Sequence, residues 1–426
     1  MGARRFLTGS AIGAVDQAML SALNFGIGLT FIRISSKSEF ALYTLMATAL
    51  LLLQSVQNAI VNAPATTLIS ASPTTRDRVA AAAAAAHVQA WMLIIVVASG
   101  IAAAVVIGLA GSQAWLPLVA AASICAVGTL SREYARAMHY LDGKPLQALK
   151  SDSLFVALAL SGGACLIALE SVSAANVLAL VGIAALVAQQ LDRAHRLTSL
   201  LRSWLAAKVS RGSMLEIWQC ARWALPSVLN TWIYANAFLY VVGIWMSQAA
   251  VAELSAARLL GVPLSLVMAG WSSAFRPRAG QWLATGQADK VHRLALRSVL
   301  GFLAIGLVYA VLLWLALPIV EKHVLGAKYH ESIALIWPWL VLATANNVRG
   351  VGQVAMLACK TSFKVLFAYG FVALAVALPA VAVASAMGTQ IGVLGALIAA
   401  ELVLAALVWQ LGWPQIRAQY TGRGEA

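Results

Sequence analysis

Long apolar runs alternate with short polar segments along the whole chain. A helix needs about 20 apolar residues to cross the hydrocarbon core of a bilayer. On that scale the pattern predicts about twelve membrane-spanning helices, near residues 10–32, 40–62, 82–108, 114–131, 153–170, 174–191, 223–245, 251–273, 297–318, 332–357, 365–386 and 390–412. The first run is too long and too polar for a cleaved signal peptide, so we count it as a span. The pattern therefore predicts an all-α integral membrane protein.

Composition agrees with this pattern and excludes other classes of protein. Of the 426 residues, 62% are hydrophobic and 10% are charged, whereas a soluble chain has about 45–50% apolar and roughly 25% charged residues. A chain this apolar cannot stay solvated as a disordered segment. The formal net charge of +14 does not indicate a nucleic-acid partner, because the basic residues lie in the gaps between apolar runs and not on one soluble face.

The distribution of Lys and Arg predicts the orientation of the spans. With the amino terminus inside, the inside segments hold 23 of the 29 basic residues, and the outside segments hold only Arg33, Lys37, Lys322 and Lys328. Basic residues accumulate on the cytoplasmic side of membrane proteins. We therefore expect both termini to lie inside. The two remaining basic residues, Arg258 and Arg349, fall within predicted spans.

The longest inside segment divides the predicted spans into six and six. We assign residues 1–195 to an N-terminal lobe, 196–222 to a basic cytoplasmic linker, and 223–426 to a C-terminal lobe with a short tail. The basic residues around Trp204 fit a helix on the inner membrane surface, and a solvated linker explains them equally well. Weak similarity between the halves at an offset of about 211 residues predicts a parallel repeat, with a cavity between two lobes.

Polar side chains inside the predicted spans are candidate site residues, because such groups are costly in lipid and tend to face a bundle interior or a water-filled cavity. In the first span they recur every three or four residues and so share one helix face. Hydrogen bonding between helices is the competing explanation for any single residue. The residues interpreted as lining a wet passage are Gln17, Ser21, Asn24, Asn58, Asn230, Tyr234 and Gln353.

Three ionisable residues inside the spans carry the functional prediction. Asp16 is a candidate for proton or cation coupling, and a structural hydrogen bond is its alternative. Arginine keeps its proton in proteins, so Arg258 and Arg349 need partners. Glu253, Asp16 or Glu401 could pair with them, Arg349 could extend toward the interface, or both could bind an anion such as phosphate. We interpret the two arginines as cations of an anion-attracting cavity.

Motifs for catalysis and metal binding are missing from the sequence. The four cysteines are far apart and form no cluster with histidine, so neither a metal site nor a disulfide framework is predicted. No P-loop is present. The predicted outside loops are too short for a folded catalytic domain. We therefore expect no enzyme activity, no catalytic residues and no cofactor.

Several segments resemble bacterial polysaccharide-export flippases, the Wzx-type transporters of the multidrug/oligosaccharidyl-lipid/polysaccharide exporter superfamily. The similarity is best over residues 8–152, and the C-terminal half agrees mainly in its layout of spans. The segments are DQAMLSALNF at 16–25, Arg33, EFALY at 39–43, QNAIVNAP at 57–64, REYAR at 132–136, and then Lys144, Pro145 and Asp152.

This resemblance implies a MATE-like fold of two six-helix lobes in the bacterial cytoplasmic (inner) membrane. It implies alternating-access translocation of undecaprenyl-diphosphate-linked glycan units for surface or exopolysaccharide synthesis, through a cationic lumen that takes the anionic lipid-linked sugar. H⁺ or Na⁺ is the implied coupling ion at Asp16, since related drug exporters use an acid of the first helix. Membrane lipids and polysaccharide polymerase machinery are the implied partners.

Two other functions stay open. A cation-coupled multidrug exporter of the same superfamily would prefer acids to arginines in its cavity. A membrane glycan polymerase or ligase is opposed by the short outside loops. A major-facilitator transporter is disfavoured, because residues 76–78 lack the pattern of glycines and basic residues that follows its second span.

Overall fold

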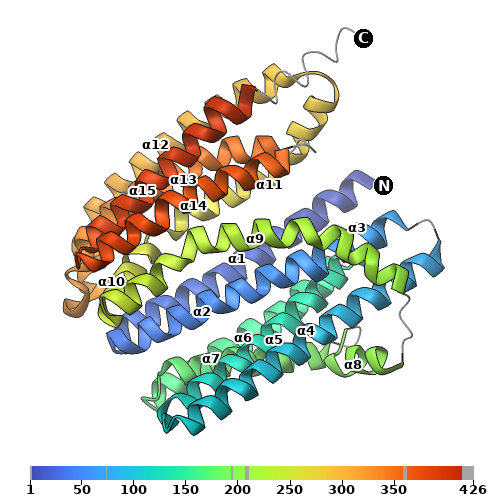
Figure 1. The fold of residues 1–426 in the computed structure, drawn as a ribbon, viewed down its shortest axis with the longest axis horizontal. Helices are drawn as coiled ribbons and strands as arrows, with labels where there is room; N and C mark the ends of the chain where they lie inside the picture. The colour runs from blue at the N-terminus through green and yellow to red at the C-terminus, as the bar shows by residue number, and fades with distance from the viewer. Residues whose placement is uncertain (1, 73, 193–194, 207–210, 358–361, 415–426) are drawn as a thin grey trace. The chain divides into compact units, whose positions relative to one another are not determined.

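A computed structural model of the chain describes residues 2–72, 74–192, 195–206, 211–357 and 362–414. Every regular element within these ranges is a helix (Figure 1), which confirms the predicted all-α class. Contacts within the chain divide it into two compact units, Met1–Leu229 and Asn230–Ala426.

The N-terminal unit holds the first eight α-helices and the beginning of the ninth. Three of its helices begin at a residue whose hydroxyl accepts a backbone N–H of the first turn: Ser36 from Glu39, Thr74 from Asp77 and Ser173 from Asn176. The elements are α1 (Gly2–Ile34), α2 (Lys37–Gln57), the π-turn η1 (Asn58–Asn62), α3 (Ala63–Ala71), α4 (Thr75–Leu109), η2 (Gln113–Trp115), α5 (Leu116–Leu141), α6 (Pro145–Ala168), α7 (Ala174–Leu191), α8 (Leu197–Ala206) and α9 (Arg211–Trp245).

The C-terminal unit begins within α9 and continues with six further α-helices. Ser247 and Thr389 cap α10 and α15 in the same way, so small hydroxyl residues mark where helices start in both units. The elements are α10 (Gln248–Leu259), α11 (Val262–Ala284), α12 (Ala288–Val320), η3 (Glu321–Leu325), η4 (Ala327–Tyr329), α13 (Ser332–Leu357), α14 (Ser362–Ala386), α15 (Gln390–Ala406) and η5 (Leu407–Gly412).

Helices α5 and α7 pack backbone to backbone. A Cβ atom added to Gly128 would lie 2.3 Å from the carbonyl oxygen of Gly182, and one added to Gly182 would lie 2.6 Å from the backbone of Cys125. Small residues let membrane helices approach this closely. Buried Leu118 and Leu178 extend the contact with apolar side chains. The two glycines therefore make α5 and α7 one tightly joined pair.

The number of spans is lower than the sequence predicts. Within the described ranges, ten helices are long and apolar enough to cross a membrane, or eleven if α10 and α11, which meet at a 51° bend, form one broken span. The span predicted at 332–357 is α13, which is not among these ten helices. Asn346, Asn347 and Arg349 interrupt its apolar run. The two predicted spans that do not pass this test, 251–273 and 332–357, are nevertheless helical in the structure. A break interrupts the first and a polar stretch interrupts the second, so the count falls from twelve to ten or eleven.

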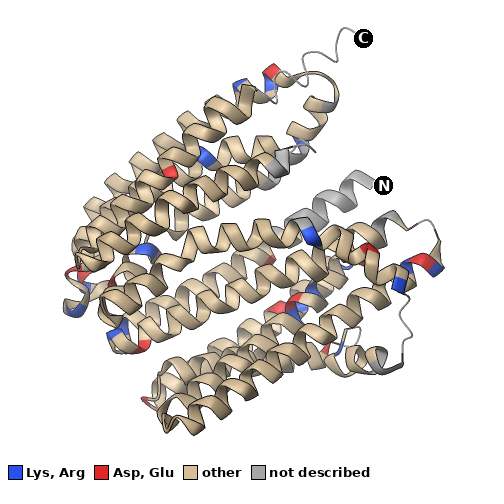
Figure 2. Cartoon of the chain, viewed as in Figure 1, with Lys and Arg blue, Asp and Glu red and all other residues tan. Residues whose placement is uncertain are grey.

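Most charged side chains of the described helices lie toward helix ends, with a few in the middle of helices (Figure 2). This distribution is the one expected when helix centres lie in hydrocarbon. Together with the long apolar helices, it identifies a multi-pass membrane protein.

Much of the predicted linker, 196–222, is helical. Helix α8 packs on α4, where Leu200 joins the buried apolar cluster of Ala85 and Leu130. The ring of Trp204 also meets that of Trp91 edge-on, with 5.8 Å between ring centroids. Residues 211–222 belong to α9, whereas 207–210 lie outside the described residues. One of the four cysteines for which the sequence predicts no disulfide, Cys359, lies outside them as well.

Candidate functional site

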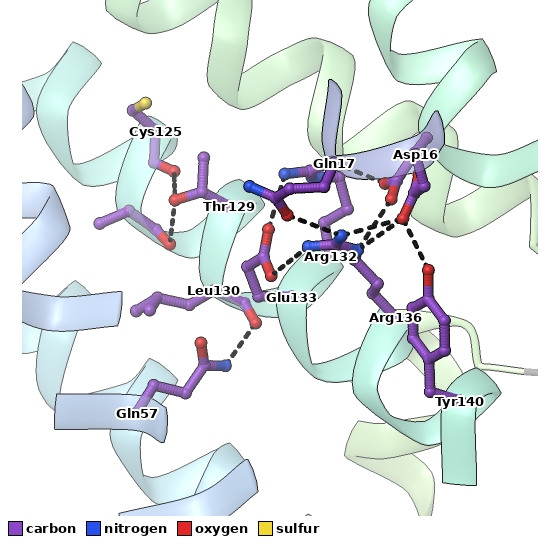
Figure 3. A network of polar contacts seen from close by, with 12 residues as sticks. Asp16, Gln17, Gln57, Cys125, Thr129, Leu130, Arg132, Glu133, Arg136 and Tyr140 are labelled. Atoms are coloured by element: carbon purple, nitrogen blue, oxygen red, sulfur yellow. Dashed lines mark hydrogen bonds and ion pairs between the residues drawn. The ribbon is translucent and has the colours of Figure 1, made fainter. Parts of the chain in front are cut away.

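A buried charge cluster joins α1, α5 and α6 of the N-terminal unit (Figure 3). On α5, Arg132, Arg136 and Tyr140 are spaced four residues apart, so they share one face of the helix. Asp16 and Gln17 come from α1, and Asp152 comes from α6. The N-terminal cluster, as we call it, consists of Asp16, Gln17, Arg132, Glu133, Arg136, Tyr140 and Asp152.

Asp16 is fully buried and links α1 to α5. Its Oδ2 accepts hydrogen bonds from Arg136 Nε and from the Tyr140 hydroxyl, each over 3.0 Å (Figure 3). Arg136 also donates from Nη2 to Oε1 of Gln17 over 3.1 Å. The other oxygen of Asp16, Oδ1, has no hydrogen-bond partner in the described part of the chain. Asp16 thus has one oxygen engaged by α5 and one oxygen with no described donor.

Asp152 and Glu133 are the other two acids of the cluster. Arg132 donates from Nη1 to Oδ1 of Asp152 over 2.6 Å, and its Nη2 lies 2.8 Å from Oε1 of Glu133. Arg136 Nε lies 3.1 Å from Oδ2 of Asp152. Three carboxylates thus face two guanidinium groups. Because an unbalanced charge is costly in a buried site, the excess negative charge favours uptake of one proton or cation.

A cavity of about 500 Å³ opens beside this cluster. Arg136, Glu133 and Tyr140 line it together with Asn58 and Asn62. These two asparagines begin and end the π-turn η1, which lies just before the Pro64 that cannot donate a backbone hydrogen bond. Single π-turns within helices are frequent at functional sites. The cluster therefore borders a polar space within the unit.

A second charge cluster lies in the C-terminal unit, around the fully buried carboxylate of Glu401 on α15. Arg349 Nε on α13 donates to Oε1 over 2.5 Å, and the Tyr234 hydroxyl on α9 donates to Oε2 over 2.6 Å. Arg349 also donates from Nη1 to Gln353. Among the partners considered from the sequence, Glu401 is therefore the acid that pairs with Arg349.

Arg258 has a different environment. Its Nη1 donates to Oδ1 of Asn236 over 3.2 Å, and its guanidinium lies 5.7 Å from the ring centroid of Trp339. No acid pairs with it among the described residues. Arg258 precedes the break between α10 and α11, where the Tyr309 hydroxyl donates to the Leu260 carbonyl over 2.7 Å. The Leu260 carbonyl at the break is thus hydrogen-bonded by a protein group, whereas no described acid balances the charge of Arg258.

Three predicted site residues, Arg258, Arg349 and Tyr234, line one cavity of about 470 Å³. Glu401 and Trp339 line it as well. Two guanidinium groups face one carboxylate there, so the cavity carries an excess of one positive charge. The arrangement can attract an anion to its guanidinium groups, while the Trp339 ring interacts with the Arg258 cation.

The other predicted polar residues have different places. Asn58 lines the N-terminal cavity, whereas Ser21 and Asn24 line neither this cavity nor the one beside Arg258. Asn230 donates to the carbonyl of Phe367 over 3.3 Å, which is a contact between α9 and α14. This contact is the hydrogen bond between helices that the sequence left open as its alternative.

With the fourth span ending at 131, the sequence predicts Arg132 and Arg136 in the inside segment that follows it, and this helix end is wrong. Helix α5 continues past the predicted end at 131 to Leu141 and carries both arginines into the unit, where acids neutralise them. The signal was the four-residue spacing, which continues the helical periodicity up to Gly143 and Pro145.

No protein-family model and no curated protein sequence matches the chain. Among solved structures, it is similar to an inward-facing multidrug resistance MATE family transporter of the MOP superfamily, with a TM-score of 0.68, 14% identity and 95% of both chains covered. It is also similar to the eukaryotic MATE transporter AtDTX14, with a TM-score of 0.61, 13% identity and 97% of both chains covered. A third similar structure is a variant of the Vibrio cholerae MATE transporter VcmN, with a TM-score of 0.57, 16% identity and 97% of both chains covered. The chain therefore has the fold of MATE transporters.

Proposed function

We propose that the chain is a membrane transporter that works by alternating access and couples export of a small molecule to a cation. Likeness in fold to a multidrug resistance transporter and to other MATE transporters over nearly the whole chain supports this function, and favours it over the glycan flippase implied by the sequence motifs. The observation that carries the coupling is the fully buried carboxylate of Asp16. One of its oxygens is held by Arg136 and Tyr140, and the other has no hydrogen bond from any described residue.

The coupling follows from the charges around Asp16. While Asp16 is ionised, it attracts Arg136 and accepts the Tyr140 hydroxyl, so α1 stays joined to α5. A proton on Asp16 removes that attraction and leaves Arg136 to Asp152 and Glu133. The link between the two helices is then weaker. Where two conformations differ by a few kcal/mol, a weaker link between α1 and α5 can shift the population from one conformation to the other.

The test is transport by the purified protein in liposomes. An imposed pH or sodium gradient should drive movement of a fluorescent cationic dye. Asp16→Asn should abolish gradient-driven movement, because the amide cannot gain or lose a charge. Glu170→Gln is the matched control, since Glu170 is an exposed acid between α6 and α7. Gradient-driven transport by Asp16→Asn at the wild-type rate would refute coupling through this residue.

The cavity around Arg258 favours a second candidate, the flippase for undecaprenyl-diphosphate-linked glycans of the bacterial inner membrane. Its excess positive charge suits a diphosphate, which guanidinium groups bind well. This function would join the chain to polysaccharide synthesis. A labelled undecaprenyl-diphosphate sugar in the same liposomes distinguishes the candidates: a flippase exposes it in the opposite leaflet, whereas a drug exporter moves only the dye.

A further inference from the structure

The N-terminal unit contains a different cavity, of about 770 Å³, where α3, α4, α5 and α8 meet. Much of its wall is apolar, including Ile69, Ala82, Met138 and Leu200. Two cations, Arg78 and Arg196, are also in the lining, and both are exposed. The transport proposals above use none of these residues.

The two arginines are available to a ligand. Among the described residues, neither guanidinium has an ion-pair partner. Asp142, an acid of the same lining, is already shared between Lys144, at 3.6 Å from its Oδ2, and His195, at 3.5 Å. The cavity therefore combines two unneutralised positive charges with an apolar wall.

The backbone around the cavity also favours an anionic ligand. Thr75 is the first residue of α4, and Ser199 lies in the first turn of α8, so both helices begin at this cavity. The N-terminal end of a helix carries a partial positive charge. An anionic group in the cavity would thus meet two helix starts in addition to Arg78 and Arg196.

We propose that this cavity binds an anionic phospholipid, with the phosphate at Arg78 and Arg196 and an acyl chain along the apolar wall. A free phosphate would leave that wall exposed to water. Basic pockets between membrane helices are known to recognise acidic lipid headgroups. Helix α8 forms one wall of this pocket. Its Leu200 packs in the adjacent apolar cluster, and Arg196 directly precedes its first turn.

The experiment measures lipid retained by the delipidated protein in detergent, by native mass spectrometry with phosphatidylglycerol or phosphatidylcholine. We expect wild type to prefer phosphatidylglycerol. The double variant Arg78→Gln/Arg196→Gln should bind it about 30-fold more weakly, as for two contacts of roughly 1 kcal/mol each. Arg76→Gln is the matched control, since Arg76 is exposed in the same turn of α4 but does not line the cavity.

A second variant tests the apolar part of the site. Ala82→Phe fills the wall without changing charge and should also reduce retention of phosphatidylglycerol, with the melting temperature recorded to confirm folding. Equal retention of the two lipids by wild type would overturn the proposal. So would an equal loss in Arg76→Gln and the double variant, or full displacement of the lipid by millimolar inorganic phosphate, which would indicate a site for free phosphate.

Discussion

Arg349 on α13 donates a hydrogen bond to Glu401 on α15, with 2.5 Å between Nε and Oε1, and the carboxylate is fully buried. The Tyr234 hydroxyl on α9 binds the second carboxylate oxygen. One acid thus ties together three helices of the C-terminal unit. A buried ion pair adds little net stability, but removing one partner is costly because the other charge stays buried.

Removal of one partner should therefore cost more than removal of both. We expect Arg349→Met to lower the free energy of unfolding by about 3–5 kcal/mol, because Tyr234 would be the one described partner left to Glu401. The double variant Arg349→Met/Glu401→Leu should regain most of that loss. Unfolding in mixed detergent micelles measures both. Equal stability of the single and double variants would show that the pair is not a buried charge pair.

Arg258 should behave in the opposite way, since no acid among the described residues depends on it. We expect Arg258→Gln to change stability little and to weaken binding of a diphosphate-bearing amphiphile about tenfold or more, the loss of one charge-assisted contact. Calorimetric titration measures the affinity. Arg297→Gln, which changes an exposed arginine of α12 in the same unit, is the control. Equal affinity of wild type and Arg258→Gln would remove Arg258 from any anion site.

The contact between α5 and α7 predicts a steric effect. Gly182→Ala should destabilise the N-terminal unit by roughly 1–3 kcal/mol, because the new Cβ would lie 2.6 Å from the Cys125 backbone and the helices would have to separate. Gly163→Ala on α6 is the control, since a Cβ there meets nothing within 4 Å. Thermal unfolding compares the two. A smaller effect at Gly182 than at Gly163 would contradict the close packing.

His195 lies just before α8, and its environment predicts that the stability of the protein depends on pH. Burial lowers its pKa below the ordinary 6.5, as does His139, whose ring centroid is 4.7 Å away, while Asp142 and Asp192 act to raise it. Between the lowered pKa and 6.5 the unfolded chain binds more protons, so stability falls as the pH falls through that window.

We therefore expect wild type to be less stable at about pH 5.5 than at about pH 7.5, and His195→Gln to reduce that difference. Melting temperatures across this range, in the same detergent, provide the measurement. His139 and its partner Asp192 are kept in the variant, so the difference between the two curves reports the loss of the His195 ring together with its contact to His139. An unchanged pH slope in His195→Gln would contradict the assignment.

The fold could largely be predicted from sequence, because span length and hydroxyl caps are local signals. Ser36, Thr74 and Ser247 each precede an apolar run and each caps a helix. The number of spans was predicted less well, because α10 and α11 meet at a break and α13 contains a polar stretch. Average hydropathy does not show that a neighbouring side chain such as Tyr309 can hydrogen-bond the backbone carbonyl exposed at a break.

The charge clusters could be predicted only in part. Asp16, Arg258 and Arg349 stand out because each interrupts an apolar run. Arg132 and Arg136 did not, since a basic residue at the end of an apolar run has the appearance of a loop cation. The partner that brings Arg136 into the protein, Asp16, is 120 residues away. A pairing over that distance leaves no local pattern in one sequence.

The close packing of α5 and α7 has a consequence for movement within the N-terminal unit. Because the backbones of α5 and α7 are in contact at Gly128 and Gly182, a movement of α5 relative to α7 would have to break a backbone contact. Helix α1 packs mainly against α6, and polar side chains, Asp16 and Gln17, link it to α5. A movement of α1 relative to α5 would therefore exchange hydrogen bonds and ion pairs, which a proton or a cation can replace.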